Sequence, residues 1–210
     1  MTPSNADNFL SPFGPPVVQV ASTESEWLAD AAARSLEVRV VAHVQRVPTD
    51  AANVTSVVEG STAGRPPLVI MTPRSGWYAC ASERGGGIAC WIELLRSLRD
   101  AKPTRSVLFV ASTGHELGHL GIDQFIEQRP GIVRQAVAWL HLGANIGAAI
   151  EPRYRLQASD DELEEALGSR LATVGMPVSQ RVPRGYVPAG EAEAVHQGGG
   201  RYVSVVGGSA

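Results

Sequence analysis

Apolar and polar positions along this chain follow two alternating patterns, which predict strands and helices in turn. Three runs, at 68–72, 106–112 and 133–142, are apolar enough for strands that are buried on both faces. Helical periodicity follows the first run at 85–98, and a second helix is expected to end before Pro130. This alternation predicts a parallel or mixed sheet sandwiched by helices.

Shorter segments supply the remaining elements. A helix with a Ser or Thr cap is expected at 23–33, and the pair Ser159 and Glu162 forms a capping box that predicts another helix. Five further segments have the alternation or the short apolar runs of strands: 37–47, 53–59, 153–158, 178–182 and 202–206. The first two of these segments are expected to pair as an antiparallel edge.

The composition is typical of one folded domain. The 210 residues are 44% apolar and 19% charged, which excludes disordered and fibrous classes. A chain of this length can bury a full core, so any metal ion would serve function rather than folding. We expect residues 1–16, rich in Pro, Asn and Ser, to be a flexible leader, and residues 17–210 to form a single α/β domain.

The balance of charges and the hydropathy of the sequence exclude some classes of binding partner. The 18 Lys and Arg against 21 Asp and Glu, with no long basic run, predict no nucleic-acid partner. No apolar stretch approaches the roughly 18 residues of a membrane span, and the N-terminus lacks a signal-peptide pattern, so we expect no membrane partner and a cytoplasmic location. Partner classes left open are a peptide or small-molecule ligand, a second copy of the chain, and a partner subunit.

One stretch spells a zinc-protease motif. Residues His115 to His119 read H-E-x-x-H, in which two histidines one helical turn apart hold zinc and the glutamate is the general base. The motif requires a continuous helix. Here a buried strand ends just before it, and Gly114 and Gly118 disfavour a helix through it. The match is therefore expected to be coincidental.

Segments of the chain, taken in order, are similar to a known family. They are PLVIMTPRS, SERGGGIACWIELLRSL, RSVLFVASTGHELGHLGIDQF, AVAWLHLGANIG and GGGRYVSVVG. In this order they resemble the H-x-D-S strand, the D-N-x-S-G helix, the G-E-E-x-G-L-x-G-S loop, the strand that ends in a ligand aspartate, and the final strand of the co-catalytic zinc exopeptidases. That family includes bacterial leucyl aminopeptidases, glutamate carboxypeptidase II and glutaminyl cyclase. The resemblance implies a three-layer α/β sandwich with a mixed, mostly parallel sheet, without the usual C-terminal helix.

The chemistry of that family needs five ligands for two zinc ions and a glutamate base. The resemblance implies that this chain is a degenerate member, because most of those positions are substituted. The substitutions are Thr72 for a histidine, Arg74 for its orienting aspartate, Glu83 for the bridging aspartate, His115 for the base, His141 for an aspartate, and Glu193 or nearby His196 for the last histidine. Glu116 is the one ligand position that keeps the family residue.

At most one zinc ion is expected in such a site. The candidate ligands are carboxylates and imidazoles, which suit zinc: Glu83, Glu116, His141, and either Glu193 or His196. With a zinc ion held there, His115 could act as a general base, since its imidazole titrates near neutral pH.

Two arginines argue against a zinc ion at these residues. Arg74 and Arg84 carry permanent positive charge, so beside Glu83 they are expected to form ion pairs that occupy its carboxylate, or to bind a substrate or anion. The glycine run 85–87 could cradle an anion at the start of its helix, whereas the resemblance implies tight packing beneath the metal site.

Two functions follow from these residues. The first is a non-catalytic ligand-binding or assembly module that has kept the aminopeptidase-like sandwich. The second is an atypical mononuclear zinc metallohydrolase of the aminopeptidase or amidase type. Cys80 lies in a loop with no histidine nearby in sequence, so its use as a nucleophile is a weaker expectation.

Overall fold

The computed structural model describes residues 9–11, 17–41, 43, 45, 47–148, 153–176 and 178–208. Its strands are β1 Val54–Val58, β2 Leu68–Pro73, β3 Val107–Ser112, β4 Ala138–Leu142, β5 Arg153–Ala158, β6 Val178–Arg181 and β7 Tyr202–Gly208. Its helices are η1 Ser22–Glu24, α1 Ser25–Ala33, α2 Ala81–Ala101, η2 His115–Leu117, α3 Leu120–Glu127, α4 Ile132–Gln135, α5 Asp161–Thr173 and α6 Ala192–Gln197.

The seven strands form one mixed sheet in the order β1-β3-β2-β4-β7-β5-β6. The β3, β2, β4 and β7 strands run parallel at its centre, whereas β1 and β5 each pair with a neighbour in antiparallel orientation. This is the predicted fold class: an α/β sandwich whose sheet is mixed and mostly parallel. The carboxyl ends of the central strands therefore meet at one edge, which is where parallel sheets place their ligand sites.

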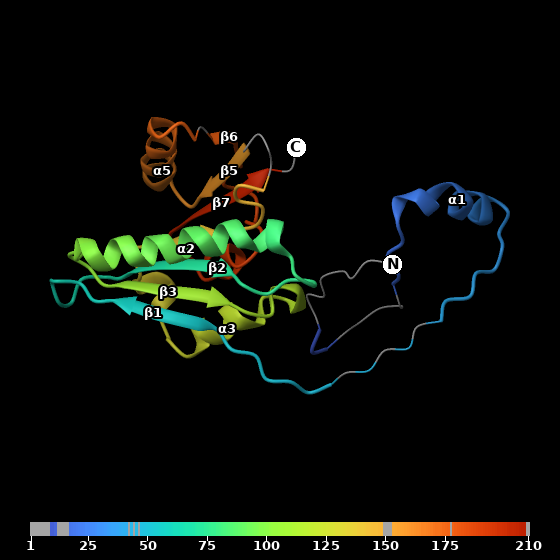
Figure 1. Ribbon diagram of the computed structural model, residues 1–210, viewed down its shortest axis with the longest axis horizontal. Helices are drawn as coiled ribbons and strands as arrows, with labels where there is room; N and C mark the ends of the chain where they lie inside the picture. The colour runs from blue at the N-terminus through green and yellow to red at the C-terminus, as the bar shows by residue number, and fades with distance from the viewer. Residues whose placement is uncertain are drawn as a thin grey trace.

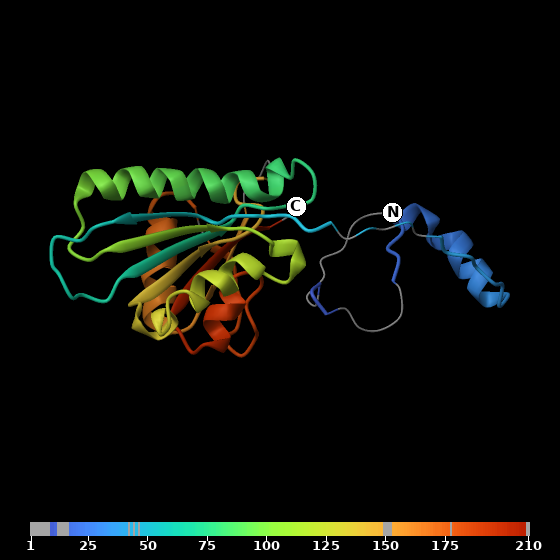
Figure 2. The ribbon, with the colours of Figure 1, turned by 90° about the horizontal axis from the view of Figure 1, so that it is seen from below.

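Helices cover both faces of the sheet, as Figures 1 and 2 show. On one face, Trp91 of α2 and partly buried leucines of α5 pack with Ile70 and Phe109 of the sheet. On the other, Ile122 of α3 belongs to a second core that includes residues of α4 and α6. Because both faces of the sheet are buried, the sequences of the central strands are continuous apolar runs.

The hydrophobic pattern predicted most strands within two residues, and the differences have local causes. The run at 133–142 is not one strand, because its first part forms α4 and only Ala138–Leu142 joins the sheet. The cap of α5 is Asp160 rather than Ser159, and its carboxylate accepts a hydrogen bond from the backbone N–H of Leu163. Helix α6 was not predicted.

The N-terminal part differs more from expectation. No described residue of 37–47 lies in a strand, so β1 forms the antiparallel edge with β3 instead. Figures 1 and 2 show α1 standing apart from the sheet. Of the expected leader at 1–16, only residues 9–11 are described. The proposed domain boundary at residue 17 stays a prediction.

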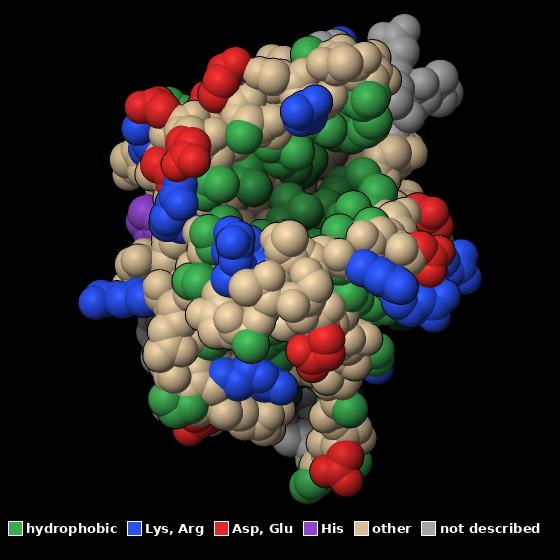
Figure 3. Space-filling view, turned by 90° about the vertical axis from the view of Figure 1, so that its left-hand side faces the viewer, with side chains coloured by type: hydrophobic (Ala, Val, Ile, Leu, Met, Phe, Trp, Pro, Cys, Tyr) green, Lys and Arg blue, Asp and Glu red, His purple; other side chains and the backbone are tan. Residues whose placement is uncertain are grey.

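Figure 3 shows hydrophobic side chains gathered in a hollow at one end of the molecule, between the upper part that carries α5 and the part below it. Partly buried leucines of α2 and α5 pack against the core on this face of the sheet. No helix in the described part of the chain is long and apolar enough to cross a membrane.

Candidate functional site

The candidate site lies at the carboxyl ends of β2, β3 and β4. Thr72 is 1% exposed near the end of β2, and its hydroxyl donates a 2.8 Å hydrogen bond to the backbone oxygen of Leu142. Thr72 stands where the resemblance implies a zinc-binding histidine. Because its hydroxyl is committed to the neighbouring strand, Thr72 contributes to packing of the sheet rather than to a ligand set.

A buried arginine occupies the middle of one half of the site. The side chain of Arg84 is 4% exposed, and its Nη2 lies 2.9 Å from Oε1 of Glu116 and 3.0 Å from Oε1 of Glu83. Its Nε donates to the backbone oxygen of Ser75 at 2.8 Å. The predicted ion pair with Glu83 is therefore present, and it extends to Glu116.

The other carboxylate oxygens of this cluster also have donors. The Ser75 hydroxyl donates to Oε2 of Glu116, and the Cys80 thiol donates to Oε2 of Glu83. Burial opposes ionisation of Glu116, but hydrogen bonds from Arg84 and Ser75 hold its pKa below the usual value. The hydrogen bond to Glu83, and burial after it, raise the pKa of the Cys80 thiol, which argues against Cys80 as a nucleophile.

A second cluster centres on Glu191, which is fully buried. Its Oε1 lies 3.1 Å from Nδ1 of His115 and accepts a 3.0 Å hydrogen bond from Ser112. Its Oε2 lies 3.4 Å from Nε2 of His141, without the alignment of a hydrogen bond, and Nδ1 of His141 lies 2.8 Å from the Ser204 hydroxyl. Glu191 thus lies against both histidines of the site.

The charge on Glu191 is maintained by these neighbours. Burial opposes ionisation, but the hydrogen bond with His115 and the proximity of His141 hold the pKa of Glu191 well below its usual value. An ionised carboxylate only accepts hydrogen bonds, so Nδ1 of His115 carries the proton that faces it. The carboxylate fixes the orientation and tautomer of the imidazole, as it would for a general base.

The two candidates for the last ligand lie apart from His141. Glu193 faces Gln197, whose amide donates to its carboxylate at 2.7 Å, and His196 lies 3.2 Å from the Tyr202 hydroxyl. Neither is in the cluster with His141, where Glu191 lies instead. Helix α6 begins immediately after Glu191, so the residues that follow turn away from the site.

Arg74 is exposed at the end of β2 and forms no ion pair with any residue that the structure describes. The predicted pairing of Arg74 with Glu83 is therefore absent, and Arg84 alone of the two arginines reaches that carboxylate.

The H-E-x-x-H stretch does not form a helix. Residues His115–Leu117 form a single 3₁₀ turn, and Gly118 and His119 both have positive φ. The ring centroids of His115 and His119 are 4.9 Å apart, but one residue lies against Glu191 while the other opens onto the surface. The expectation that the motif lacks its helical context is confirmed.

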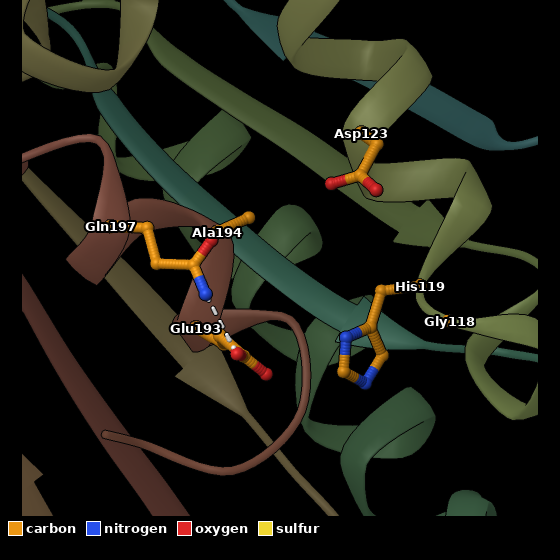
Figure 4. A pocket seen from close by; sticks show the side chains of 6 residues that line it. All are labelled: Gly118, His119, Asp123, Glu193, Ala194 and Gln197. Atoms are coloured by element: carbon orange, nitrogen blue, oxygen red, sulfur yellow. Dashed lines mark hydrogen bonds between the residues drawn. The ribbon is translucent and has the colours of Figure 1, made fainter. Parts of the chain in front are cut away.

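A polar pocket adjoins the second cluster. It has a volume of about 220 Å³ and is lined by residues of α3, of α6 and of the connection between η2 and α3: Gly118, His119, Asp123, Glu193, Ala194 and Gln197. Figure 4 shows the side chains of His119 and Asp123 on one wall and of Glu193 and Gln197 on the other. Burial, and after it the negative charges of Glu193 and Glu191, raise the pKa of Asp123.

The donor set does not fit a two-zinc centre. The candidate ligands form two separate clusters: Arg84 pairs with Glu83 and Glu116 in one, and Glu191 lies between His115 and His141 in the other. Among the residues that the structure describes, no three His, Cys, Asp or Glu side chains are grouped so that they could hold a metal ion.

Comparison with known proteins agrees with this architecture. No protein-family model matches the chain. The zinc aminopeptidase BSAP of Bacillus subtilis superposes with a TM-score of 0.61 at 14% identity, over 74% of this chain and 40% of its own. A glutaminyl cyclase from an Acidobacteriales bacterium gives 0.61 at 16% identity, over 73% and 57%. The M28 peptidase precursor of Shewanella amazonensis gives 0.57 at 18% identity, over 72% and 35%.

This chain has the fold of the zinc aminopeptidases. The aminopeptidase-like fold confirms the resemblance seen in the sequence. A curated relative, mouse transferrin receptor protein 2, is 26% identical over 116 residues, which are 52% of this chain and 14% of the receptor. The chain therefore spans less than two thirds of the length of each of these four proteins.

Proposed function

We propose that this chain is a non-catalytic ligand-binding or assembly module built on the aminopeptidase-like fold. The observation that carries the proposal is the division of the candidate ligands into two separate clusters, in each of which the carboxylates are already in contact with other side chains of the chain. Zinc catalysis needs ligands that converge with free lone pairs on one ion and leave a position for water. Here the Glu116 carboxylate accepts hydrogen bonds on both oxygens, from Arg84 and from Ser75.

The curated relative supports the same class of function. It is named as a receptor for transferrin, and not as a peptidase. A binding role asks only that the sandwich and its surface persist, whereas a peptidase role asks for specific side chains at the site. Loss of those side chains with retention of the fold is the pattern expected for a binding module.

One observation favours a second candidate, an atypical mononuclear zinc metallohydrolase. The Glu191 carboxylate orients His115 through a 3.1 Å contact with Nδ1, the arrangement in which a carboxylate supports an imidazole base. In this alternative, Glu83, Glu116 and His141 would hold one zinc ion. His196 is less suited to that role, because it contacts Tyr202 instead.

Metal content and hydrolysis measured together separate the two functions. The purified full chain is dialysed against zinc or manganese, its metal is counted by elemental analysis, and it is assayed on aminoacyl anilides and simple amides. The matched variants are Glu116→Ala, which removes the candidate ligand, and Glu193→Ala, which changes a carboxylate outside both clusters.

We expect no metal-dependent hydrolysis above the rate in buffer, for the native chain and for both variants. Hydrolysis that requires the metal, and that Glu116→Ala abolishes while Glu193→Ala does not, would overturn the binding-module proposal and establish the hydrolase. Light scattering on the same samples tests assembly by giving the number of copies in solution.

A further inference from the structure

The buried Arg84 is the group in the site that the aminopeptidase chemistry does not use. A guanidinium that is 4% exposed must be paired, because an isolated charge is costly to remove from water. Two carboxylates face it, Glu83 at 3.0 Å and Glu116 at 2.9 Å. One permanent cation thus lies between the two acidic side chains that align with metal-ligand positions.

The loop before α2 is shaped around this arginine. Gly76 leaves room for Cys80, since a Cβ there would come within 2.6 Å of the Cys80 Cβ and 2.7 Å of its sulfur, whereas the Arg84 Cγ would be at an ordinary contact distance of 3.6 Å. Cys80, which precedes α2, adopts a left-handed conformation with φ of 46° and donates its thiol to Glu83. These contacts place Arg84 one turn into a 21-residue helix, so its position is fixed by the backbone.

Each of the four carboxylate oxygens of Glu83 and Glu116 lies against a cation or a hydrogen-bond donor. Arg84 Nη2 takes one oxygen of Glu83 and one of Glu116, while Cys80 and Ser75 donate to the remaining two oxygens. Arg84 Nη1 is buried without a partner. A divalent cation would need some of these same oxygens, and it would have to approach a guanidinium that cannot lose its proton.

We propose that the Arg84 guanidinium replaces a divalent cation as the positive charge that holds Glu83 and Glu116, and that removing it uncovers a cation site at these carboxylates. The inference rests on the proposed function, in which the native chain does not use a catalytic zinc ion. It assigns to Arg84 a structural role that a metal ion could take over.

The test replaces Arg84 and offers the cation alone. Arg84→Met keeps an unbranched apolar side chain and removes the guanidinium with its charge, and Arg84→Lys keeps a charge. Arg96→Met is the matched control, because Arg96 lies on the same helix with a side chain that is 68% exposed. The double variant Arg84→Met with Glu116→Gln removes one of the uncovered carboxylates.

Each protein is measured for Tm and bound metal with a chelator, with zinc and with manganese. We expect Arg84→Met to lose stability in chelator, to bind about one ion per chain, and to gain about 5 °C in Tm at a cation concentration roughly a hundredfold above its Kd. The native chain, Arg84→Lys, Arg96→Met and the double variant are expected to show no such gain.

Two results would overturn the inference: a native chain that gains as much Tm as Arg84→Met, or an Arg84→Met variant that responds to neither cation. If Arg84→Met does not fold in chelator, circular dichroism with and without the ions gives the same decision, because folding restored by a cation supports the proposal and failure to restore it overturns it. Zinc-dependent hydrolysis by the native chain would refute the proposed function without deciding this test.

Discussion

Glu191 is the residue whose environment departs most from what its type prefers. A carboxylate is almost never fully buried unless it is paired, and Glu191 is 0% exposed between two imidazoles and the hydroxyl of Ser112. The sequence analysis considered Glu193 and His196 at this edge of the sheet and did not single out Glu191. Which residue of this stretch faces the site depends on where helix α6 begins, at Ala192.

Removing this carboxylate should be costly. Glu191→Ala leaves His115, His141 and the Ser112 hydroxyl without their acidic partner, and leaving buried polar groups unsatisfied costs about 1–3 kcal/mol each. We expect a loss of that size in the free energy of unfolding, measured by urea denaturation. Glu193→Ala, two positions on and partly exposed, is expected to change it by about 0.5 kcal/mol at most.

A loss of less than about 1 kcal/mol for Glu191→Ala, or equal losses for the two variants, would contradict this description of the buried cluster.

At the scale of elements, helix α2 shows why a glycine run need not bind an anion. Gly86 packs beneath the 146–147 peptide, where a Cβ would come within 1.7 Å of the Ile146 backbone oxygen. Gly85 faces open space, with no atom within 4 Å of the equivalent position. Tight packing, which the family resemblance implied, therefore accounts for Gly86 but not for Gly85.

Two neighbouring substitutions should consequently act in opposite directions. Gly85→Ala is expected to raise the free energy of unfolding by about 0.5–1 kcal/mol, because alanine is the better helix former and the position is open. Gly86→Ala is expected to lower it, because the new methyl group meets backbone that cannot move aside. Thermal or urea unfolding measures both, and a gain for Gly86→Ala would contradict the packing.

The strands show what hydrophobic pattern can and cannot predict. Apolar runs predicted β2 and β3 closely, because strands buried on both faces have few other interpretations. Alternation at 37–47 predicted a strand that none of the described residues of this segment forms, since alternation alone does not supply a partner strand. Helix α4 was predicted as part of a strand, and helix α6 was not predicted. Helices of four to six residues give little periodicity to detect.

At the scale of the whole molecule, an ion pair ties α5 to the last strand. Arg201, just before β7, lies 3.0 Å from Oδ1 of Asp160, the cap of α5. The hydrogen bond from Arg201 is the largest influence on Asp160, and with the helix cap it lowers the pKa of that carboxyl to about 2 against the opposing effect of burial. The sequence predicted the helix and the strand but not the pair that joins them.

This lowered pKa sets an acid dependence of stability. A carboxyl with a depressed folded-state pKa contributes stability above its unfolded value of 3.8, and that contribution is lost as the pH falls through about 2. Asp160→Asn keeps the cap and removes the charge. We therefore expect the native chain to exceed the variant in unfolding free energy at pH 5, and the difference to shrink steadily towards pH 2.

Urea titrations at several pH values measure this difference. A gap between the two proteins that stays constant from pH 5 to pH 2 would show that the Asp160 charge does not contribute through Arg201.

The pairing of β4 with β7 has a consequence for synthesis and folding. His141 meets the Ser204 hydroxyl across 63 positions of the chain, and Glu191 also lies far beyond β4 in sequence. A ribosome must therefore complete β7 before the buried histidine can find its partners, and until then the open side of β4 exposes unpaired backbone. A chain cut short before β7 would keep the residues of the Arg84 cluster but would lack Ser204, the hydrogen-bond partner of His141.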